Sequence, residues 1–245
     1  MTSSSTMAPE VSVVIPVFDE EGNVADLAVE IARAFEGRSY EMIFVDDASR
    51  DGTLQALMAL KAALPQLRVL AHEKNAGQSR ALRTGAQAAR GQILVTLDGD
   101  GQNDPADAPA LVERLKAGGP ELGLVGGLRL RRQDSWSKKV GSKIGNGVRR
   151  RILRDDALDT GCGLKAMWRS AYLRFPYFDH MHRFLPALAK REGLKVDFAP
   201  VRHRPRASGQ SKYTNWRRLK ASLGDLAGVV WLLNRARPPG TVEEP

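Results

Sequence analysis

Short apolar runs and helical repeats alternate along the first half of the chain. Five runs are rich in β-branched or other apolar residues and short enough to be strands; they cover residues 11–17, 40–46, 67–71, 92–97 and 122–128. The segments between them place apolar residues three or four apart, as in a helix with one buried face; helices are expected at residues 20–36, 51–63, 77–89 and 105–117. This alternation predicts an α/β fold, a mostly parallel sheet with helices on both faces.

The second half of the chain carries two basic amphipathic segments. In residues 136–152, Trp, Val and Ile recur every four residues, and lysines and arginines occupy the other faces. Residues 215–235 repeat this pattern. Such helices suit the plane of an anionic membrane surface; the alternative is that their apolar faces pack on the sheet or on each other. The membrane is favoured for residues 136–152, whereas both interpretations stay open for residues 216–233.

The same patterns divide the chain into parts. We expect a disordered N-terminus (residues 1–10), an α/β domain (11–213), a C-terminal amphipathic helix (214–237) and a loose tail (238–245). The longest apolar run, residues 226–233, is much shorter than the roughly 20 residues that span a bilayer. The N-terminus lacks the apolar stretch of a signal peptide, and the single cysteine permits no internal disulfide. These features predict a cytoplasmic protein.

Composition and charge narrow the possible partners. Apolar residues make up 42% of the chain, which is too many for a disordered protein. The formal net charge is +9, so the surface attracts anions such as nucleic acid, anionic lipid or phosphorylated substrates. The sequence contains no recognised nucleic-acid motif, no P-loop and no GxGxxG after a strand. Nucleic acid is therefore not expected as a partner, and ATPase and dehydrogenase functions are excluded.

Acidic residues follow three of the expected strands. The clusters are Asp19, Glu20 and Glu21; Asp46 and Asp47, followed by Ser49; and Asp98, Asp100 and Asp104 with Gln102. In open α/β sheets, ligands bind at the carboxyl ends of the strands. Carboxylates gathered at one such edge repel each other unless a cation or hydrogen-bond donors accompany them. The sequence therefore predicts a divalent metal at this edge.

The segment Asp98-Gly-Asp100-Gly-Gln102 is the best candidate for that metal. Mg²⁺ and Mn²⁺ prefer oxygen ligands and usually keep a substrate phosphate as well. An EF-hand calcium loop is excluded, because Asn103 stands where Gly is needed and Pro109 where Glu is needed. A solvated acidic turn is the other alternative, and the position directly after an apolar strand favours the metal.

After the second strand, Asp47 is assigned to the nucleotide. A carboxylate at a strand end can accept hydrogen bonds from a base N–H or a ribose hydroxyl. Ser49 and Asp51 are interpreted differently, as the cap and charged first turn of the following helix.

Several segments, in this order and at these spacings, resemble family 2 glycosyltransferases of the GT-A fold, which is Rossmann-like. They are VSVVIPVFDEEGNV, IFVDDASRDGT, NAGQSRALRTGAQAARG and LVTLDGDGQNDP. Three later segments resemble the polyprenyl-phosphate glycosyltransferases, the dolichol-phosphate mannosyltransferase-like group; they are DTGCGLKAMWRS, MHRFLPAL and RHRPRASGQSKY. The resemblance covers roughly residues 11–235.

The resemblance implies a role for each matching residue. Pro16, Glu20 and Asp47 would line the base and ribose, and Asp98 would contact the nucleotide. Asp100 and Gln102 would hold Mg²⁺ or Mn²⁺. Arg129, Arg202 and Lys212 would face phosphates, and Asp159, Cys162 and Lys165 belong to the acceptor loop. Asp19 stands where the family usually has Asn, and Cys162 where Ser is common.

The residue content of the second half indicates a phosphate acceptor. Transfer to a hydroxyl needs a general base, and no Glu-Asp or Asp pair occurs between residues 161 and 193. A phosphate monoester is already largely ionised near neutral pH, since its second pKa is about 6. His182 and His203 are alternatives as bases, although a structural or phosphate-neighbouring role is favoured. The expected reaction is an inverting transfer from a UDP- or GDP-sugar to a polyprenyl phosphate.

Two other enzyme functions stay open. One is family 2 transfer to a hydroxyl of a glycan or lipid; the other is a sugar nucleotidyltransferase, although the acidic segment at residues 18–21 replaces the Gly-rich basic signature expected there. The protein is expected to dock peripherally on the inner face of the cell membrane, or to recruit a separate membrane subunit.

Overall fold

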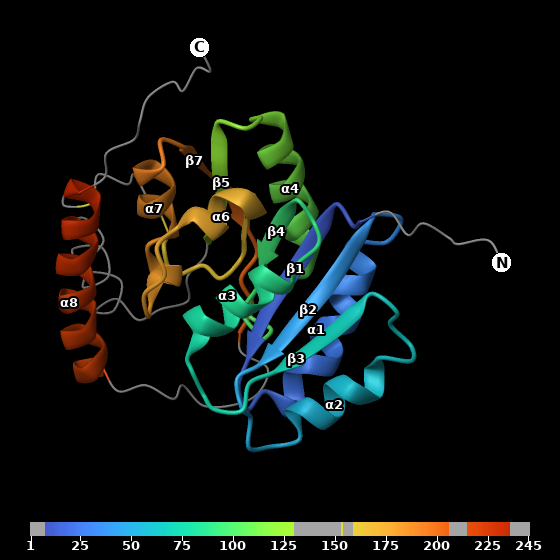
Figure 1. Cartoon of the computed structure of the whole chain (residues 1–245). Helices are drawn as coiled ribbons and strands as arrows, with labels where there is room; N and C mark the ends of the chain where they lie inside the picture. The colour runs from blue at the N-terminus through green and yellow to red at the C-terminus, as the bar shows by residue number, and fades with distance from the viewer. Residues whose placement is uncertain (1–7, 130–152, 154–158, 206–214, 236–245) are drawn as a thin grey trace, which may run out of the picture.

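The computed structural model describes residues 8–129, 153, 159–205 and 215–235, with side chains of the last segment from residue 224 onward. Within these residues, seven strands form one sheet in the order β3-β2-β1-β4-β6-β5-β7 (Figure 1). The strands are β1 (Val11–Val17), β2 (Tyr40–Asp46), β3 (Leu67–Ala71), β4 (Ile93–Thr96), β5 (Leu122–Arg129), β6 (Lys165–Trp168) and β7 (Lys195–Val201). The five strands expected from the sequence are confirmed to within two residues at each end.

Helices cover both faces of the sheet (Figure 1). They are α1 (Glu21–Ala34), α2 (Thr53–Leu60), α3 (Gln78–Ala88), α4 (Ala108–Ala117), α6 (Arg169–Arg174), α7 (Leu185–Arg191) and α8 (Asn215–Asn234), with short 3₁₀ turns η1 (Pro105–Asp107) and η2 (Met181–Arg183). The helix expected at 105–117 begins as the turn η1, where the Asp104 carboxylate accepts a hydrogen bond from the Ala106 N–H.

The strand directions are mostly parallel, as predicted, with one exception among the described strands. Pairs β1–β2, β1–β4, β2–β3 and β5–β7 are parallel, whereas β6 runs antiparallel to both of its neighbours, β4 and β5. Strand β6 therefore begins at the sheet edge where β4 ends. This reversal brings a later part of the chain to the carboxyl end of β4.

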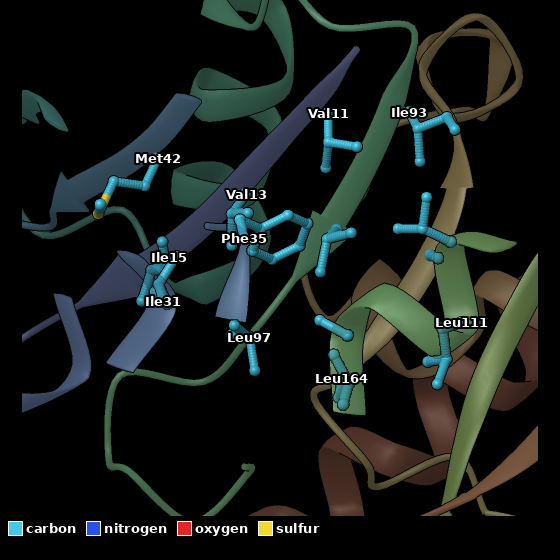
Figure 2. Packing of buried hydrophobic residues seen from close by; sticks show 14 of the residues in the cluster. Val11, Val13, Ile15, Ile31, Phe35, Met42, Ile93, Leu97, Leu111 and Leu164 are labelled. Carbon is cyan, nitrogen blue, oxygen red and sulfur yellow. The ribbon is translucent and has the colours of Figure 1, made fainter. Parts of the chain in front are cut away.

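Alternating side chains of the central strands fill a core on each face of the sheet. On one face, Val11, Val13 and Ile15 of β1 pack with Ile31 and Phe35 (Figure 2). On the other face, Val14 belongs to a second cluster that includes residues of α3, α6 and α7. Each large apolar side chain buried in this way contributes about 1.5–3 kcal/mol. The two cores fix the strand ends that carry the acidic residues.

The C-terminal helix α8 packs one of its sides on the second core. Val229 is buried, and Leu226, Val230 and Leu233 contact the cluster from the same helix. Trp231 points away from the core and is 58% exposed. The amphipathic segment at residues 136–152 lies outside the described residues, and the adjoining Leu153 is buried. Among the helices that the structure describes, none has the length and apolar content needed to cross a bilayer.

Candidate active site

The pairing of β4 with β6 places Asp98 beside residues 159–165, the predicted acceptor loop. Thr96 of β4 is paired with Lys165 of β6, and the Thr96 hydroxyl donates a hydrogen bond of 2.7 Å to the Gly163 carbonyl. Because the strands are antiparallel, the residues after Thr96 lie next to the residues before Lys165. A Cβ on Gly163 would come within 2.3 Å of the Asp98 carboxylate. The predicted metal motif and the predicted acceptor loop therefore meet at one point.

The charge of Asp98 is poorly compensated by its protein surroundings. Removal from water raises its pKa to about 6, and the negative charge of Asp100 acts in the same direction. Lys165 and Arg129 partly oppose this rise, and Gln78 donates a hydrogen bond of 2.8 Å to Asp98 Oδ1. A buried carboxylate whose ionised form is disfavoured by burial and by a neighbouring carboxylate is a suitable place for a cation.

The residues of this turn fit a hard divalent metal. Gly101 adopts the left-handed backbone conformation, with φ of 69°, and the Gln102 N–H donates 3.1 Å to Asp100 Oδ1. Two carboxylates and an amide oxygen are the ligand types that Mg²⁺ and Mn²⁺ take. Among the described residues no three His, Cys, Asp or Glu side chains gather as a complete metal site. A metal here would therefore depend on further oxygen ligands, such as those of a diphosphate.

Two cations lie beneath the acceptor loop. The Arg129 guanidinium forms a two-pronged ion pair with Asp159, at 2.6 Å from Nε and 2.8 Å from Nη2. Lys165 is only 4% exposed and donates a hydrogen bond to the Cys162 carbonyl. Burial lowers the pKa of Lys165, and the nearby Cys162, Asp98 and Asp159 oppose that shift. The loop is thus held against the sheet by charged groups that lie close to Asp98.

Cys162 is a packing residue. Its side chain is 1% exposed, and its sulfur lies so close to Gly127 that a Cβ there would approach within 2.8 Å. Burial raises the pKa of the thiol, so the reactive thiolate is disfavoured. Its backbone carbonyl accepts the hydrogen bond from Lys165 and so helps to position that side chain.

The nucleotide residues expected from the sequence lie at the ends of β1 and β2. Asp47 is 3% exposed and accepts hydrogen bonds from three groups; they are His72 Nδ1 at 2.7 Å, the Ala76 N–H at 2.9 Å and the Gly77 N–H at 2.8 Å. Asp47 thus holds the N-terminal end of α3 against the sheet. Pro16 is buried within β1, and the Glu20 carboxylate accepts 2.6 Å from Asn23. Their contacts with a nucleotide stay predictions.

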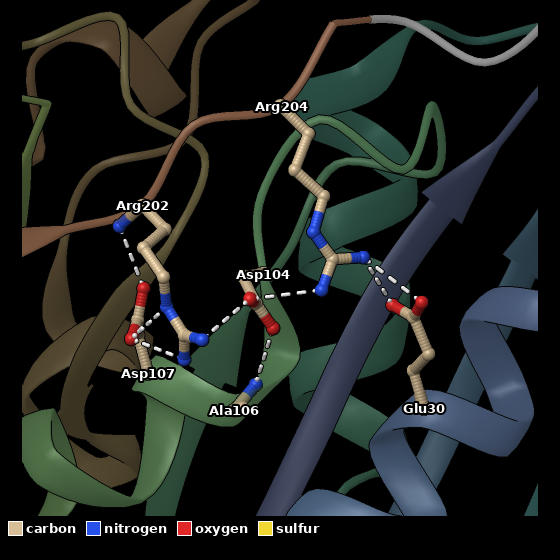
Figure 3. Close-up of polar contacts among 6 residues, drawn as sticks. All are labelled: Glu30, Asp104, Ala106, Asp107, Arg202 and Arg204. Carbon is tan, nitrogen blue, oxygen red and sulfur yellow. Dashed lines mark hydrogen bonds and ion pairs between the residues drawn. The ribbon is translucent and has the colours of Figure 1, made fainter. Parts of the chain in front are cut away.

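The structure gives Arg202 two acidic partners. Its guanidinium lies 2.8 Å from Asp107 and 3.1 Å from Asp104. Arg204 bridges Asp104 and Glu30, at 2.8 and 2.9 Å (Figure 3). These pairs tie the segment after β7 to η1 and α1. A phosphate contact by Arg202, which stays a prediction, would have to share the guanidinium with these carboxylates. Lys212 lies outside the described residues.

A pocket of about 190 Å³ opens between Asp98 and the acceptor loop. Its polar lining comes from α3, the loop, β6 and η2; it includes Gln78, Asp98, Thr160, Lys165, His182 and Arg183. Gln78 and Arg183 were not predicted as site residues. Gln78 lies within the segment NAGQSRALRTGAQAARG, which resembles family 2 glycosyltransferases. However, Gln78 carries no charge and belongs to no motif that would distinguish it from a solvated helix residue.

Comparison with known proteins identifies the family. Residues 12–175 match the family described as glycosyl transferase family 2. The chain belongs to this family. It is 33% identical over 243 residues to a dodecaprenyl-phosphate galacturonate synthase of Rhizobium johnstonii, covering 97% of this chain and 71% of the relative. It is 35% identical over 207 residues to an undecaprenyl-phosphate 4-deoxy-4-formamido-L-arabinose transferase of Edwardsiella ictaluri, covering 83% of this chain and 62% of that protein. The predicted resemblance is confirmed.

Solved structures confirm the GT-A fold of this family 2 glycosyltransferase. Glucosyl-3-phosphoglycerate synthase from Mycobacterium tuberculosis, in complex with UDP, superposes with a TM-score of 0.69 at 19% identity, covering 95% of this chain and 82% of that one. The mannosyltransferase PcManGT from Pyrobaculum calidifontis, in complex with GDP-Man and Mn²⁺, gives 0.68 at 22% identity, covering 96% and 67%.

Proposed function

We propose that this protein transfers a sugar from a UDP- or GDP-sugar to a polyprenyl phosphate. The observation that carries the proposal is the meeting of Asp98 with the loop that bears Lys165, because it puts an acidic donor-side motif next to buried cations. The names of the relatives agree with this acceptor, since both describe transfer to a polyprenyl phosphate.

On the donor side, Asp100 and Gln102 would hold Mg²⁺ or Mn²⁺ with the diphosphate of the donor, and Asp98 would contact the nucleotide. The metal supplies neutralisation of the negative charge that develops on the leaving nucleoside diphosphate. Asp47, Glu20 and Pro16 would lie along the base and ribose, at the ends of β1 and β2. Structures of the same fold that contain UDP with Mn²⁺ or Mg²⁺ support this assignment.

On the acceptor side, Lys165 and Arg129 would attract the phosphate and orient it. One phosphate oxygen forms a bond to the anomeric carbon of the sugar while the bond from that carbon to the diphosphate oxygen breaks. The leaving diphosphate takes the electron pair, and in-line attack inverts the anomeric configuration. No base is needed because the phosphate is already ionised. His182 is unsuited to that task, since burial and the nearby cations Arg183 and Lys165 lower its pKa to about 3.

We further propose that the protein works peripherally on the inner face of the cell membrane, where a polyprenyl phosphate is embedded. The outer side of α8 carries the exposed Trp231, and the guanidinium of Arg235 stacks over its ring at 5.6 Å. An aromatic ring beside a cation suits an anionic lipid surface, and the net charge of +9 adds to the attraction. A separate membrane subunit is the alternative anchor. Sedimentation with anionic and with zwitterionic vesicles, for the wild type and Trp231→Ala, tests lipid binding.

A transfer assay tests the reaction. Purified protein is incubated with Mg²⁺ or Mn²⁺, a short polyprenyl phosphate and a panel of UDP- and GDP-sugars, and lipid products are identified by mass spectrometry. The expected product is a glycosyl-phosphoryl-polyprenol that requires metal and disappears in Asp100→Ala. Asp26→Ala, which removes an exposed carboxylate on α1, is the matched control. Transfer to a hydroxyl acceptor instead of the phosphate would overturn the proposal.

A further inference from the structure

Ser79 and His182 form a partly buried hydrogen-bonded pair that the proposed reaction does not use. Ser79 Oγ lies 2.8 Å from His182 Nδ1, and the backbone N–H of His182 donates to the same oxygen at 3.3 Å. Ser79 lies in the first turn of α3, and His182 lies in η2, more than a hundred residues later in the chain. Ser79 is completely buried, whereas His182 lines the pocket beside Asp98.

The hydrogen bonds determine which nitrogen of His182 carries the proton. The buried Ser79 hydroxyl has one proton to donate, and within the described residues His182 Nδ1 is its acceptor. If Nδ1 carried a proton, that hydroxyl would be left without an acceptor, which costs about 1–3 kcal/mol for a buried group. Nδ1 therefore accepts the bond from Ser79, and the proton of the neutral ring resides on Nε2.

The ring is also kept neutral. Burial and the positive charges of Arg183 and Lys165 hold the pKa of His182 far below its ordinary value. A neutral imidazole with its proton on Nε2 is a hydrogen-bond donor at that atom, and it cannot act there as a base. Within the described residues, Ser79 is the hydrogen-bonding partner of the ring, so the Nε2–H is available to a ligand in the pocket.

The pocket is small. Its volume of about 190 Å³ is below the roughly 300–1,000 Å³ of pockets that enclose a whole drug-sized ligand. It lies between Asp98, assigned to the donor nucleotide, and the loop assigned to the acceptor phosphate. The group that must lie between the leaving diphosphate and the attacking phosphate is the transferred sugar.

We propose that this pocket takes the transferred sugar and that His182 Nε2–H donates a hydrogen bond to one of its oxygens, with Ser79 as the positioning residue that fixes the ring. This inference rests on the proposed function and names a residue that selects the sugar. A site built to bond a sugar oxygen rejects an analogue that lacks it, because the buried donor is then left without a partner.

Two substitutions separate the ring's two nitrogens. His182→Gln reaches the position of Nε2 with an amide N–H, whereas His182→Asn reaches only the position of Nδ1 and can still accept from Ser79. Binding is measured by calorimetry with UDP and GDP and with the matching UDP- and GDP-hexoses, in the presence of Mn²⁺ and without acceptor. We expect His182→Asn to weaken the nucleotide-sugar about tenfold more than the free nucleotide, and His182→Gln to restore most of the loss.

Ser79→Ala tests the positioning role. It frees Nδ1 to carry the proton, so we expect a smaller selective loss of nucleotide-sugar affinity, about threefold. The double variant with His182→Asn should bind no worse than His182→Asn alone, because the two residues act together. Equal losses for nucleotide and nucleotide-sugar, or no loss in His182→Asn, would overturn the inference alone. A wild type that binds neither UDP, GDP nor their sugars would instead overturn the proposed function.

Discussion

Gly163 lies directly against the carboxylate of Asp98, and a Cβ at this position would come within 2.3 Å of the Asp98 carboxyl carbon. The contact joins the end of β4 to the start of β6, so the loop before β6 can approach Asp98 only if it carries no side chain at residue 163. The close approach of this loop to Asp98 therefore requires glycine at position 163.

Gly163→Ala is expected to impair catalysis far more than stability. The clash falls on the end of a side chain, which can rotate away, so the fold survives while Asp98 leaves its position. We expect kcat/KM to fall at least about a hundredfold, as for the loss of a positioned charged group, with a small change in melting temperature. Gly228→Ala is the matched control because nothing lies within 4 Å of its Cβ. An unchanged kcat/KM in Gly163→Ala would contradict this account of the loop.

The control substitution carries a prediction of its own. Gly228 lies inside α8 and is exposed to solvent. Replacing it with Ala should therefore raise the helix propensity without a steric cost. We expect a stabilisation of about 1 kcal/mol or less, measured by urea unfolding, with no change in activity. A destabilisation would mean that another part of the chain packs on this side of α8.

The Arg129–Asp159 pair is expected to matter for folding as well as for phosphate binding. Both side chains are largely buried, 13% and 7% exposed. Arg129→Ala removes the guanidinium that compensates the charge of the buried Asp159 carboxylate, and breaking a buried pair costs about 3–5 kcal/mol. The exposed pair Arg38–Glu113 is the comparison, since a surface pair contributes about 0–1 kcal/mol. Urea unfolding of Arg129→Ala and Arg38→Ala measures the difference; similar losses would show that burial does not decide the contribution.

The sequence predicted the sheet well up to β5 and poorly after it. The first strands are continuous apolar runs, as buried parallel strands are, whereas β6 is four residues long and begins with Lys165, and β7 is partly exposed. The acidic residues at the strand ends could be predicted because the strands themselves could be located. The contact between Asp98 and the loop before β6 could not be predicted, because the antiparallel insertion of β6 between β4 and β5 leaves no local pattern in the chain.

The roles of single charges were also hidden from the sequence. A basic residue after a strand indicates an anionic partner, but the sequence alone does not distinguish a ligand phosphate from a carboxylate of the protein. Arg202 forms ion pairs with Asp104 and Asp107, almost a hundred residues earlier. Asp47 accepts hydrogen bonds from the backbone N–H groups of residues 76 and 77. Such long-range pairs follow from the packing of complete elements, so motif spacing could place these residues at the sheet edge without giving their partners.

Metal removal is expected to stop the reaction and leave the fold intact. The ligands available at Asp98 and Asp100 do not form a complete protein site among the described residues, so the metal is expected to bind with the donor. EDTA should abolish transfer while the melting temperature of the free protein stays unchanged. Adding Mn²⁺ together with UDP or GDP should raise that temperature in the wild type but not in Asp100→Ala. A fall in melting temperature on EDTA alone would indicate a structural metal instead.

His182 is expected to make stability depend on pH in a defined direction. Its pKa falls from about 6.5 in the unfolded chain to about 3 in the folded protein, so below pH 6.5 the unfolded state binds more protons. Stability from this residue is therefore complete above pH 6.5 and is lost as pH falls towards 3, by about 1 kcal/mol per pH unit. Urea unfolding of the wild type and His182→Asn between pH 7 and 5 should show the steeper decline in the wild type, because Asn does not titrate. Parallel curves would mean that the pKa of His182 is the same in the folded and unfolded states, which would contradict the lowering that its surroundings impose.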